Sequence, residues 1–145
     1  MQWTSGKNLG FSTAAPEKLY LPVDAASDAP NVEDQLNDPN SLLNRVKKLI
    51  QLKKHEKALQ AYAEFVPVYA KENAYPFIYA RACDEEMLLI LLNPAVRESR
   101  AEFKLEPEIS SWELLAGSQS SIQKTGNRFQ VTMSGQSYSI YKLIK

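Results

Sequence analysis

The chain has 145 residues, of which 44% are hydrophobic and 23% are charged, with 17 basic and 17 acidic side chains. This length suggests one compact domain, or one domain with an appendage, and the composition is ordinary for a globular protein. The balanced charge gives no electrostatic reason to expect nucleic acid or an anionic membrane as a partner. No apolar run approaches the roughly 20 residues of a transmembrane helix.

A single cysteine, Cys83, excludes an intrachain disulfide and favours a reducing compartment. The first ten residues do not show a charged segment followed by an apolar stretch, so no signal peptide is expected. We therefore expect a cytoplasmic location.

Residues 1–38 show neither the helical nor the strand period for long, and Pro16, Pro22 and Pro30 interrupt them. This pattern predicts an extended loop. A structureless stretch of this length is unusual in a compact domain, where it is normally functional or packs on something else.

Residues 39–54 predict one amphipathic helix. Capping side chains and a proline suited to a first turn precede it at residues 38–41. Leu42, Val46 and Ile50 then recur at a spacing of four, which places them on one face. The helix should end near His55, where cationic side chains suit the negative end of the helix dipole.

Residues 60–145 alternate between apolar and polar side chains in short runs separated by turn residues. The predicted strands are residues 64–69, 76–82, 87–92, 97–104, 112–115, 122–124, 128–133 and 137–144. Short strands in this number predict an antiparallel β-sandwich of the Greek-key type. The expected fold class is therefore mainly β, with the sandwich following an extended loop and one helix.

Few residues in this sequence suggest chemistry. The only histidine, His55, has no activated nucleophile beside it in sequence, and the acidic residues after Cys83 would raise the pKa of its thiol. One histidine and one cysteine cannot make a zinc site, and no glycine-rich phosphate loop follows a strand. We expect no catalytic residue, no metal site and no cofactor.

Two surfaces are candidate binding sites. The basic helix face around Lys47 and Lys54 lacks the aromatic side chains that stack on bases, which favours an ordinary solvated face and no nucleic-acid partner. The aromatic residues of 60–145 could include a platform for a sugar ring, although most should fill the core.

Several sequence blocks resemble the α-amylase family, glycoside hydrolase family 13. Residues 1–3 (MQW) followed by residues 8–12 (NLGFS) are similar to the MQW…NAGFS segment of its α-glucosidases and trehalose synthases. Residues 19–23, 31–35, 38–43 and 49–53 look like consecutive blocks of the same family, in the same order and spacing. Thr4 stands where the family often has an acid.

The resemblance implies that residues 1–58 form the end of a (β/α)8 catalytic barrel, its last helix included, and that residues 59–145 form the C-terminal sandwich domain. It places Gln2 and Trp3 near the mouth of the active-site pocket. The family's catalytic carboxylates lie before the MQW segment, so the chain alone should be inactive, while its parent enzyme would be a retaining glycosidase acting on maltose or maltodextrins.

Three other functional hypotheses stay open. The sandwich could be a carbohydrate-binding module, or the parent could be a glucosyltransferase of the trehalose synthase type. An unrelated protein could instead use the helix face for a partner. The expected partner is the catalytic barrel of the same enzyme, with self-association through Leu42, Val46 and Ile50 as a further possibility.

Overall fold

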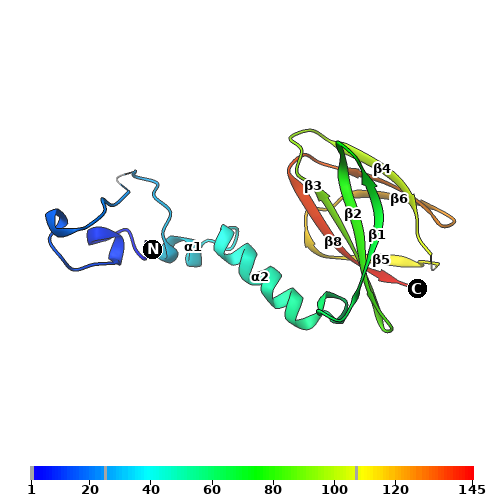
Figure 1. Cartoon of the computed structure of the whole chain (residues 1–145), viewed down its shortest axis with the longest axis horizontal. Coiled ribbons are helices and arrows are strands. Elements are labelled where there is room, and N and C mark those ends of the chain that lie inside the picture. The colour runs from blue at the N-terminus through cyan, green and yellow to red at the C-terminus, as the bar shows by residue number, and fades with distance from the viewer. Residues whose placement is uncertain (1, 25, 107) are drawn as a thin grey trace. The chain divides into compact units, whose positions relative to one another are not determined.

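The computed structural model describes residues 2–24, 26–106 and 108–145. Its helical elements are η1 (Lys7–Gly10), η2 (Pro16–Lys18), α1 (Val32–Asn37), α2 (Leu42–His55) and η3 (Lys57–Leu59). Its strands, shown in Figure 1, are β1 (Glu64–Lys71), β2 (Ala74–Cys83), β3 (Glu86–Asn93), β4 (Ser99–Lys104), β5 (Ser111–Gly117), β6 (Ser121–Thr125), β7 (Arg128–Met133) and β8 (Ser137–Ile144). The mainly β fold class expected from the sequence is confirmed.

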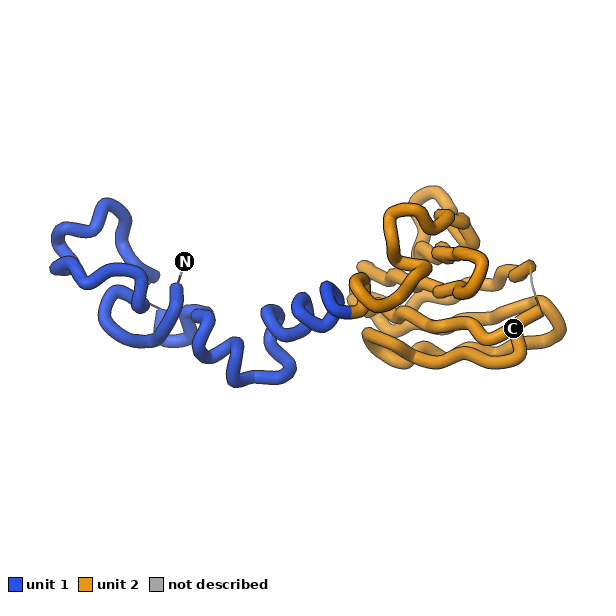
Figure 2. Tube along the Cα trace, turned by 90° about the horizontal axis from the view of Figure 1, so that it is seen from below, with its two compact units in different colours: residues 1–51 blue, residues 52–145 orange. Residues whose placement is uncertain are grey.

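The chain divides into two compact units, Met1–Gln51 and Leu52–Lys145, coloured separately in Figure 2. The division falls in the last part of α2. The two units are described one at a time below.

The first unit holds a short helix, α1, within residues 1–38, for which the sequence predicts an extended loop. Helix α1 begins after Asn31, whose side-chain oxygen accepts a hydrogen bond from the N–H of Asp34 at 2.9 Å. Six residues are too few for a helical period to show in the sequence. The cap that starts α1 therefore carried the only local signal.

Helix α2 starts where the capping residues predicted it. The hydroxyl of Ser41 accepts a hydrogen bond from the N–H of Asn44 at 3.2 Å, and the side chain of Asn44 in turn donates to the carbonyl of Gln35 at 2.8 Å. One side chain thus caps the start of α2 and another ties α2 to the end of α1. Leu42, Val46 and Ile50 share one face and are exposed.

The second unit is a sandwich of two antiparallel sheets. The five-stranded sheet has the order β1-β2-β3-β8-β5, and the three-stranded sheet has the order β4-β7-β6. The chain crosses from one sheet to the other after β3, β4, β5 and β7, so β8 returns to pair with β3 and β5. These crossings make the Greek-key type of sandwich that was expected.

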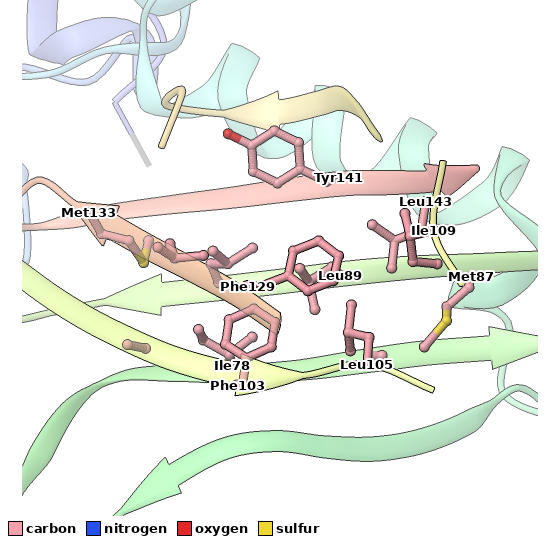
Figure 3. Close-up of a cluster of buried hydrophobic side chains, with 14 residues drawn as sticks. Ile78, Met87, Leu89, Phe103, Leu105, Ile109, Phe129, Met133, Tyr141 and Leu143 are labelled. Atoms are coloured by element: carbon pink, nitrogen blue, oxygen red, sulfur yellow. The ribbon is translucent and has the colours of Figure 1, made fainter. Parts of the chain in front are cut away.

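Side chains alternate between the two faces of each strand, and those on the inner faces fill the space between the sheets. Side chains of β2, β3 and β8 meet those of β4 and β7, as Figure 3 shows. At the centre, the rings of Phe103 and Phe129 stack with centroids 5.6 Å apart, and Trp112 meets Phe129 edge-on at 6.0 Å. Phe129 is 1% exposed, so this aromatic group lies at the middle of the core.

A buried amide holds two loops together at one end of the sandwich. Asn93, fully buried at the end of β3, donates to the carbonyl of Arg97 at 3.0 Å and to the carbonyl of Ser134 at 2.8 Å. Its oxygen accepts from the N–H of Ala95 at 3.3 Å. One side chain therefore joins the loop after β3 to the β7–β8 turn and satisfies backbone groups on both.

The two edges of the five-stranded sheet are irregular. Strand β1, at one edge, shifts its register twice, between Pro67 and Tyr69 and again before Lys71. Strand β5, at the other edge, shifts between Leu114 and Ala116. These bulges interrupt the row of backbone groups that each edge strand would otherwise present.

Candidate functional site

Gln2 and Trp3, the two residues expected near a pocket mouth, are held by their backbone. The carbonyl of Gln2 accepts from the N–H of Val32 at 3.0 Å, and the carbonyl of Trp3 accepts from the N–H of Glu33 at 2.9 Å. These are the first two amides of α1, which otherwise have no partner inside the helix. The start of α1 therefore fixes the direction of this segment.

The turn after Trp3 depends on residues that can adopt a left-handed backbone conformation. Asn8 and Leu9 have φ values of 52° and Gly10 has 73°, three consecutive residues in the left-handed region. A Cβ on Gly10 would lie 2.8 Å from Oγ1 of Thr4, and the Asn8 amide donates to the carbonyls of Ser12 at 3.0 Å and Ala14 at 2.8 Å. The asparagine and the glycine of the NLGFS motif thus make a compact turn.

A hollow of about 390 Å³ lies beside this turn. Its lining is mainly apolar and consists of Gln2, Leu9, Phe11, Tyr20, Leu21, Pro22, Val23 and Asp24. Gln2 is therefore part of a concave site, whereas Trp3 is not in the lining and is 48% exposed. The role of both residues at a pocket mouth stays a prediction.

The apolar hollow has one carboxylate among its described lining residues, that of Asp24, which also accepts from the N–H of Ala26 at 3.0 Å. Glycoside hydrolysis by the usual mechanism needs two carboxylates on opposite sides of the scissile bond. These residues can therefore shape a binding surface but cannot supply that pair.

A second hollow, of about 420 Å³, carries three aspartates, Asp28, Asp34 and Asp38, in its lining. Asp34 is engaged by the amide of Asn31 at 2.6 Å, and Asp38 accepts from the N–H of Asn40 at 2.8 Å. Within residues 2–24, 26–106 and 108–145, no group of three or more His, Cys, Asp or Glu side chains could hold a metal ion. Asp34 and Asp38 thus serve the local turns and the cap of α1.

The described residues of the first unit, 2–24 and 26–51, form no hydrophobic core. Its buried side chains, among the residues described, are all polar: Asn8, Asn31 and Ser41. Eight of its large apolar side chains are exposed: Trp3, Phe11, Tyr20, Leu21, Leu36, Leu42, Val46 and Ile50. At about 1.5–3 kcal/mol for each such side chain brought out of water, this surface strongly favours a covering partner.

The outer side of the five-stranded sheet is also apolar. Side chains of Ile78 and Ala80 point into the core, so their neighbours on β2 point outward. There the ring of Tyr79 lies 4.9 Å from that of Phe65 and 5.4 Å from that of Phe77. We call the apolar outward side chains of this sheet the apolar outer face; it comprises Phe65, Phe77, Tyr79, Ile90, Leu92, Tyr138 and Ile140, of which Ile90 and Ile140 are buried. The charged Arg81 and Lys142 project from the same side, in the row next to Tyr79 and Ile140.

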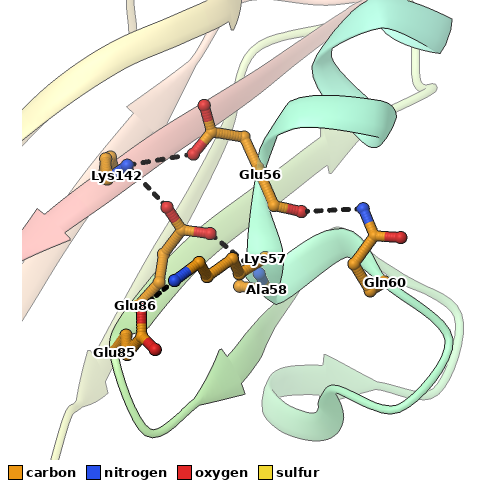
Figure 4. Close-up of polar contacts among 7 residues, drawn as sticks. All are labelled: Glu56, Lys57, Ala58, Gln60, Glu85, Glu86 and Lys142. Atoms are coloured by element: carbon orange, nitrogen blue, oxygen red, sulfur yellow. Dashed lines mark hydrogen bonds and ion pairs between the residues drawn. The ribbon is translucent and has the colours of Figure 1, made fainter.

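An ion cluster, drawn in Figure 4, fastens the segment after α2 to the sandwich. The ammonium of Lys142 lies 3.0 Å from the carboxylate of Glu56 and 2.5 Å from that of Glu86. Glu86 also accepts from the N–H of Ala58 at 2.8 Å, and Arg81 donates to the carbonyl of Ala58 at 3.2 Å. Three distant parts of the chain are joined by charge-assisted hydrogen bonds.

The cluster shifts the pKa values of its members. Burial acts to raise the pKa of Glu86, but hydrogen bonds with Glu56, the Ala58 N–H and Lys142 outweigh it, so the pKa lies below its ordinary value of 4.5. Hydrogen bonds to Glu86 and Glu56 hold the pKa of Lys142 above its ordinary value of 10.5. Both groups are therefore charged across the neutral range.

The replacement Glu86→Gln should lower the free energy of unfolding at pH 7 by about 1–2 kcal/mol. Because the folded-state pKa of Glu86 is lowered, its contribution is present above pH 4.5 and is lost as the pH falls through the folded value. The raised pKa of Lys142 keeps its contribution intact below pH 10.5. Urea unfolding measured from about pH 3, roughly one unit below the ordinary pKa of a carboxylate, to about pH 8, where carboxylates are fully ionised, should therefore show a shallower acid loss in the variant.

The exposed Glu72, in the turn between β1 and β2, provides the control. Glu72→Gln should leave the acid limb of the stability curve unchanged. An acid limb equally steep in Glu86→Gln and in the unmodified protein would contradict the role assigned to Glu86.

Other candidates from the sequence lie apart. His55 is the exposed last residue of α2, and Cys83 is a partly exposed free thiol at the end of β2. The structure does not bring these two side chains together with a catalytic partner among the described residues. Of the helices it describes, none combines the length and apolarity that crossing a membrane requires.

Comparison with known proteins gives a family match. Residues 1–62 match the family described as "Alpha amylase, catalytic domain". The probable oligo-1,6-glucosidase 2 of Bacillus subtilis is 36% identical over 97 residues, which cover 64% of this chain and 16% of that protein. The trehalose synthase/amylase TreS of Mycolicibacterium smegmatis is 39% identical over 62 residues, covering 40% of this chain and 10% of that protein.

The fold is also that of solved enzymes. The isomaltulose synthase of Erwinia rhapontici NX5 matches 99% of this chain with a TM-score of 0.74 and 26% identity, and the match covers 24% of the synthase. The chain thus spans about a sixth of the length of the first curated relative and about a quarter of the solved one. On these findings, residues 1–62 match the α-amylase family, glycoside hydrolase family 13, and the chain as a whole is similar to one region of such an enzyme.

Proposed function

We propose that the chain is a non-catalytic C-terminal part of a family 13 glucosidase that acts on α-linked glucosides, and that it supports the catalytic barrel. The observation that carries the proposal is the first unit, which matches a catalytic domain family yet buries no hydrophobic side chain among its described residues. A segment without a core is stable only when its apolar side chains pack on a partner. The remainder of the catalytic domain is the partner that fits.

The apolar outer face of the second unit supports the same role. Its aromatic side chains Phe77, Tyr79 and Tyr138 lie beside the charged row of Arg81 and Lys142, and an aromatic centre bordered by charges is typical of a protein–protein contact. We assign this face, too, to contact with the catalytic domain. In this arrangement Gln2 would contribute its amide to the edge of the substrate pocket, and the reacting carboxylates would come from the barrel.

The substrate class comes from the relatives. The names of two of them, from Bacillus subtilis and Parageobacillus thermoglucosidasius, describe oligo-1,6-glucosidases. We therefore extend the proposed substrates from maltose and maltodextrins to oligosaccharides with 1,6-linked glucose. The free thiol of Cys83 suits a reducing compartment, which supports a cytoplasmic location for the enzyme.

A complementation assay tests the proposal. The chain alone should not hydrolyse isomaltose or maltose. Mixed with the N-terminal catalytic part of the Bacillus subtilis relative, which on its own should be unstable, it should restore glucose release. Turnover by the chain alone would overturn the proposal, and so would a failure to bind that catalytic part.

The exposed face of α2 offers a matched pair of variants for this assay. Val46→Asp, on the apolar face, should abolish complementation because it would place a charge in the contact. Lys47→Asp, on the exposed polar face of the same helix, should leave complementation intact. Equal loss in both variants would argue against the assigned contact.

A glucosyltransferase of the trehalose synthase type is the second candidate. The identity of 39% to the trehalose synthase/amylase of Mycolicibacterium smegmatis is higher than that to either oligo-1,6-glucosidase, although over fewer residues. The complemented enzyme decides between the two: trehalose formed from maltose favours the transferase, and glucose as the main product favours the glucosidase.

A further inference from the structure

The outer side of the three-stranded sheet is hollowed and polar. A depression of about 580 Å³ crosses this sheet, with β1 contributing one wall. Its lining consists of Tyr69, Lys71, Arg100, Ala101, Glu102, Ser121, Gln123, Gln130, Val131 and Thr132. We call it the three-strand hollow. All of its lining residues belong to the second unit.

Strand register brings the polar side chains of the hollow into rows. Ala101 and Val131 point into the core, so the residues on either side of them point outward. Gln130 pairs with Glu102 on β4 and with Gln123 on β6, and this row runs across all three strands. A parallel row is formed by Arg100, Thr132 and Ser121.

These rows offer free hydrogen-bonding groups. In the part of the chain that the structure describes, the amides of Gln123 and Gln130 make no side-chain hydrogen bond within the protein. Each amide presents two N–H donors and an acceptor oxygen in one plane. Neighbouring strands lie about 4.8 Å apart, which is close to the width of a sugar ring.

The charges at the hollow are largely compensated. Arg100 lies 3.0 Å from the carboxylate of Glu98, and Glu102 lies 3.6 Å from the guanidinium of Arg128. Among the described lining residues, the ammonium of Lys71 has no carboxylate partner and lies over the ring of Tyr69, whereas a site for a phosphate or another anion would need several free cations. The ligand that fits is neutral and rich in hydroxyl groups.

Tyr69, on β1, contributes an aromatic ring to the wall of the three-strand hollow. The ring of Tyr69 is half-buried, and the ammonium of Lys71 lies 5.2 Å from the ring centroid. This ring supplies the aromatic surface beside the polar rows. An aromatic edge next to planar amides can contact the C–H groups of a sugar while the amides bond its hydroxyls. The apolar outer face of the other sheet lacks such amides and suits a protein partner instead.

We propose that the three-strand hollow is a binding site for a neutral oligosaccharide, with the amides of Gln123 and Gln130 as its main hydrogen-bonding groups. Such a site would hold a sugar chain on the enzyme away from the residues that react. The proposal goes beyond the scaffold role and depends on the proposed function only for the choice of sugars used as probes.

Titration of the full chain with isomaltotriose and with maltotriose, followed by ¹⁵N nuclear magnetic resonance, tests the proposal. The side-chain amide signals of Gln123 and Gln130 should shift in a saturable way, with a dissociation constant of about 1 mM, as suits a shallow site. Inorganic phosphate should leave these signals in place. The absence of any shift with both sugars would overturn the proposal, and so would shifts confined to the aromatic residues near Tyr75 and Phe77.

Matched variants of β6 locate the site. Gln123→Val should weaken binding of the sugar that shifts the signals by about tenfold, which corresponds to the loss of one good hydrogen-bonding group. Thr125→Val, on the same side of the same strand but outside the lining, should bind as the unmodified chain does. Equal affinities in both variants would place the sugar elsewhere. Because these measurements involve no turnover, their failure is distinct from a failure of the complementation assay.

Discussion

Replacing Phe129 by alanine should lower the free energy of unfolding of the second unit by about 3–5 kcal/mol. The ring is 1% exposed and contacts the rings of Phe103 and Trp112, so its removal leaves a cavity between the two sheets. Stacked sheets cannot easily close such a gap because their spacing is set by the other side chains. Urea unfolding followed by circular dichroism measures the effect.

The next residue along β7 provides the control for this core variant. Gln130 points to the outer side of the sheet, and Gln130→Ala should change the free energy of unfolding by less than about 0.5 kcal/mol. A loss below about 1 kcal/mol in Phe129→Ala would show that the centre of the core lies elsewhere.

The replacement Asn93→Ala should cost about 2–4 kcal/mol of unfolding free energy, although it removes only a small polar side chain. The variant removes three hydrogen bonds of a buried side chain: the carbonyl of Arg97 loses this donor, the carbonyl of Ser134 keeps the hydroxyl of Ser137, and the N–H of Ala95 loses its acceptor. The loss of several hydrogen bonds together with the space left by a fully buried side chain costs more than one neutral hydrogen bond usually gains.

Ser137 allows a comparison at the same carbonyl. Its hydroxyl also donates to the carbonyl of Ser134, at 2.6 Å, but from an exposed position where water can replace it. Ser137→Ala should therefore cost less than about 1 kcal/mol in the same unfolding experiment. Losses of similar size in the two variants would indicate that burial does not set the strength of this contact.

The sandwich was predictable because each strand has its own local signal. Alternation along β4 and β7 marks which side chains face the core, and the continuous apolar run of β3 marks a strand covered on both sides. Helix α2 was equally predictable, from its capping residue and from the helical spacing of its apolar residues. Helix α1 was missed because its signal lies in one asparagine, Asn31, and its hydrogen bonds reach back to Gln2 and Trp3.

The candidate sites were less predictable because they depend on pairing between distant strands. The three-strand hollow requires the register that sets Gln123 opposite Gln130, and no pattern within either strand states that register. The ion cluster joins Glu56, Glu86 and Lys142, which are up to 86 residues apart. The position of Gln2 in a hollow was expected from a resemblance and not from the periodicity of the sequence.

The irregular edges of the five-stranded sheet bear on how this protein avoids aggregation. With Pro67 and two register shifts on β1 and a third shift on β5, neither border offers an uninterrupted ladder onto which another molecule could add a strand. The interior of that sheet, around β3, is nevertheless a hydrophobic run of the kind that promotes fibril growth. While the apolar outer face waits for its partner during synthesis, the two bulged borders would keep newly made chains from stacking edge to edge.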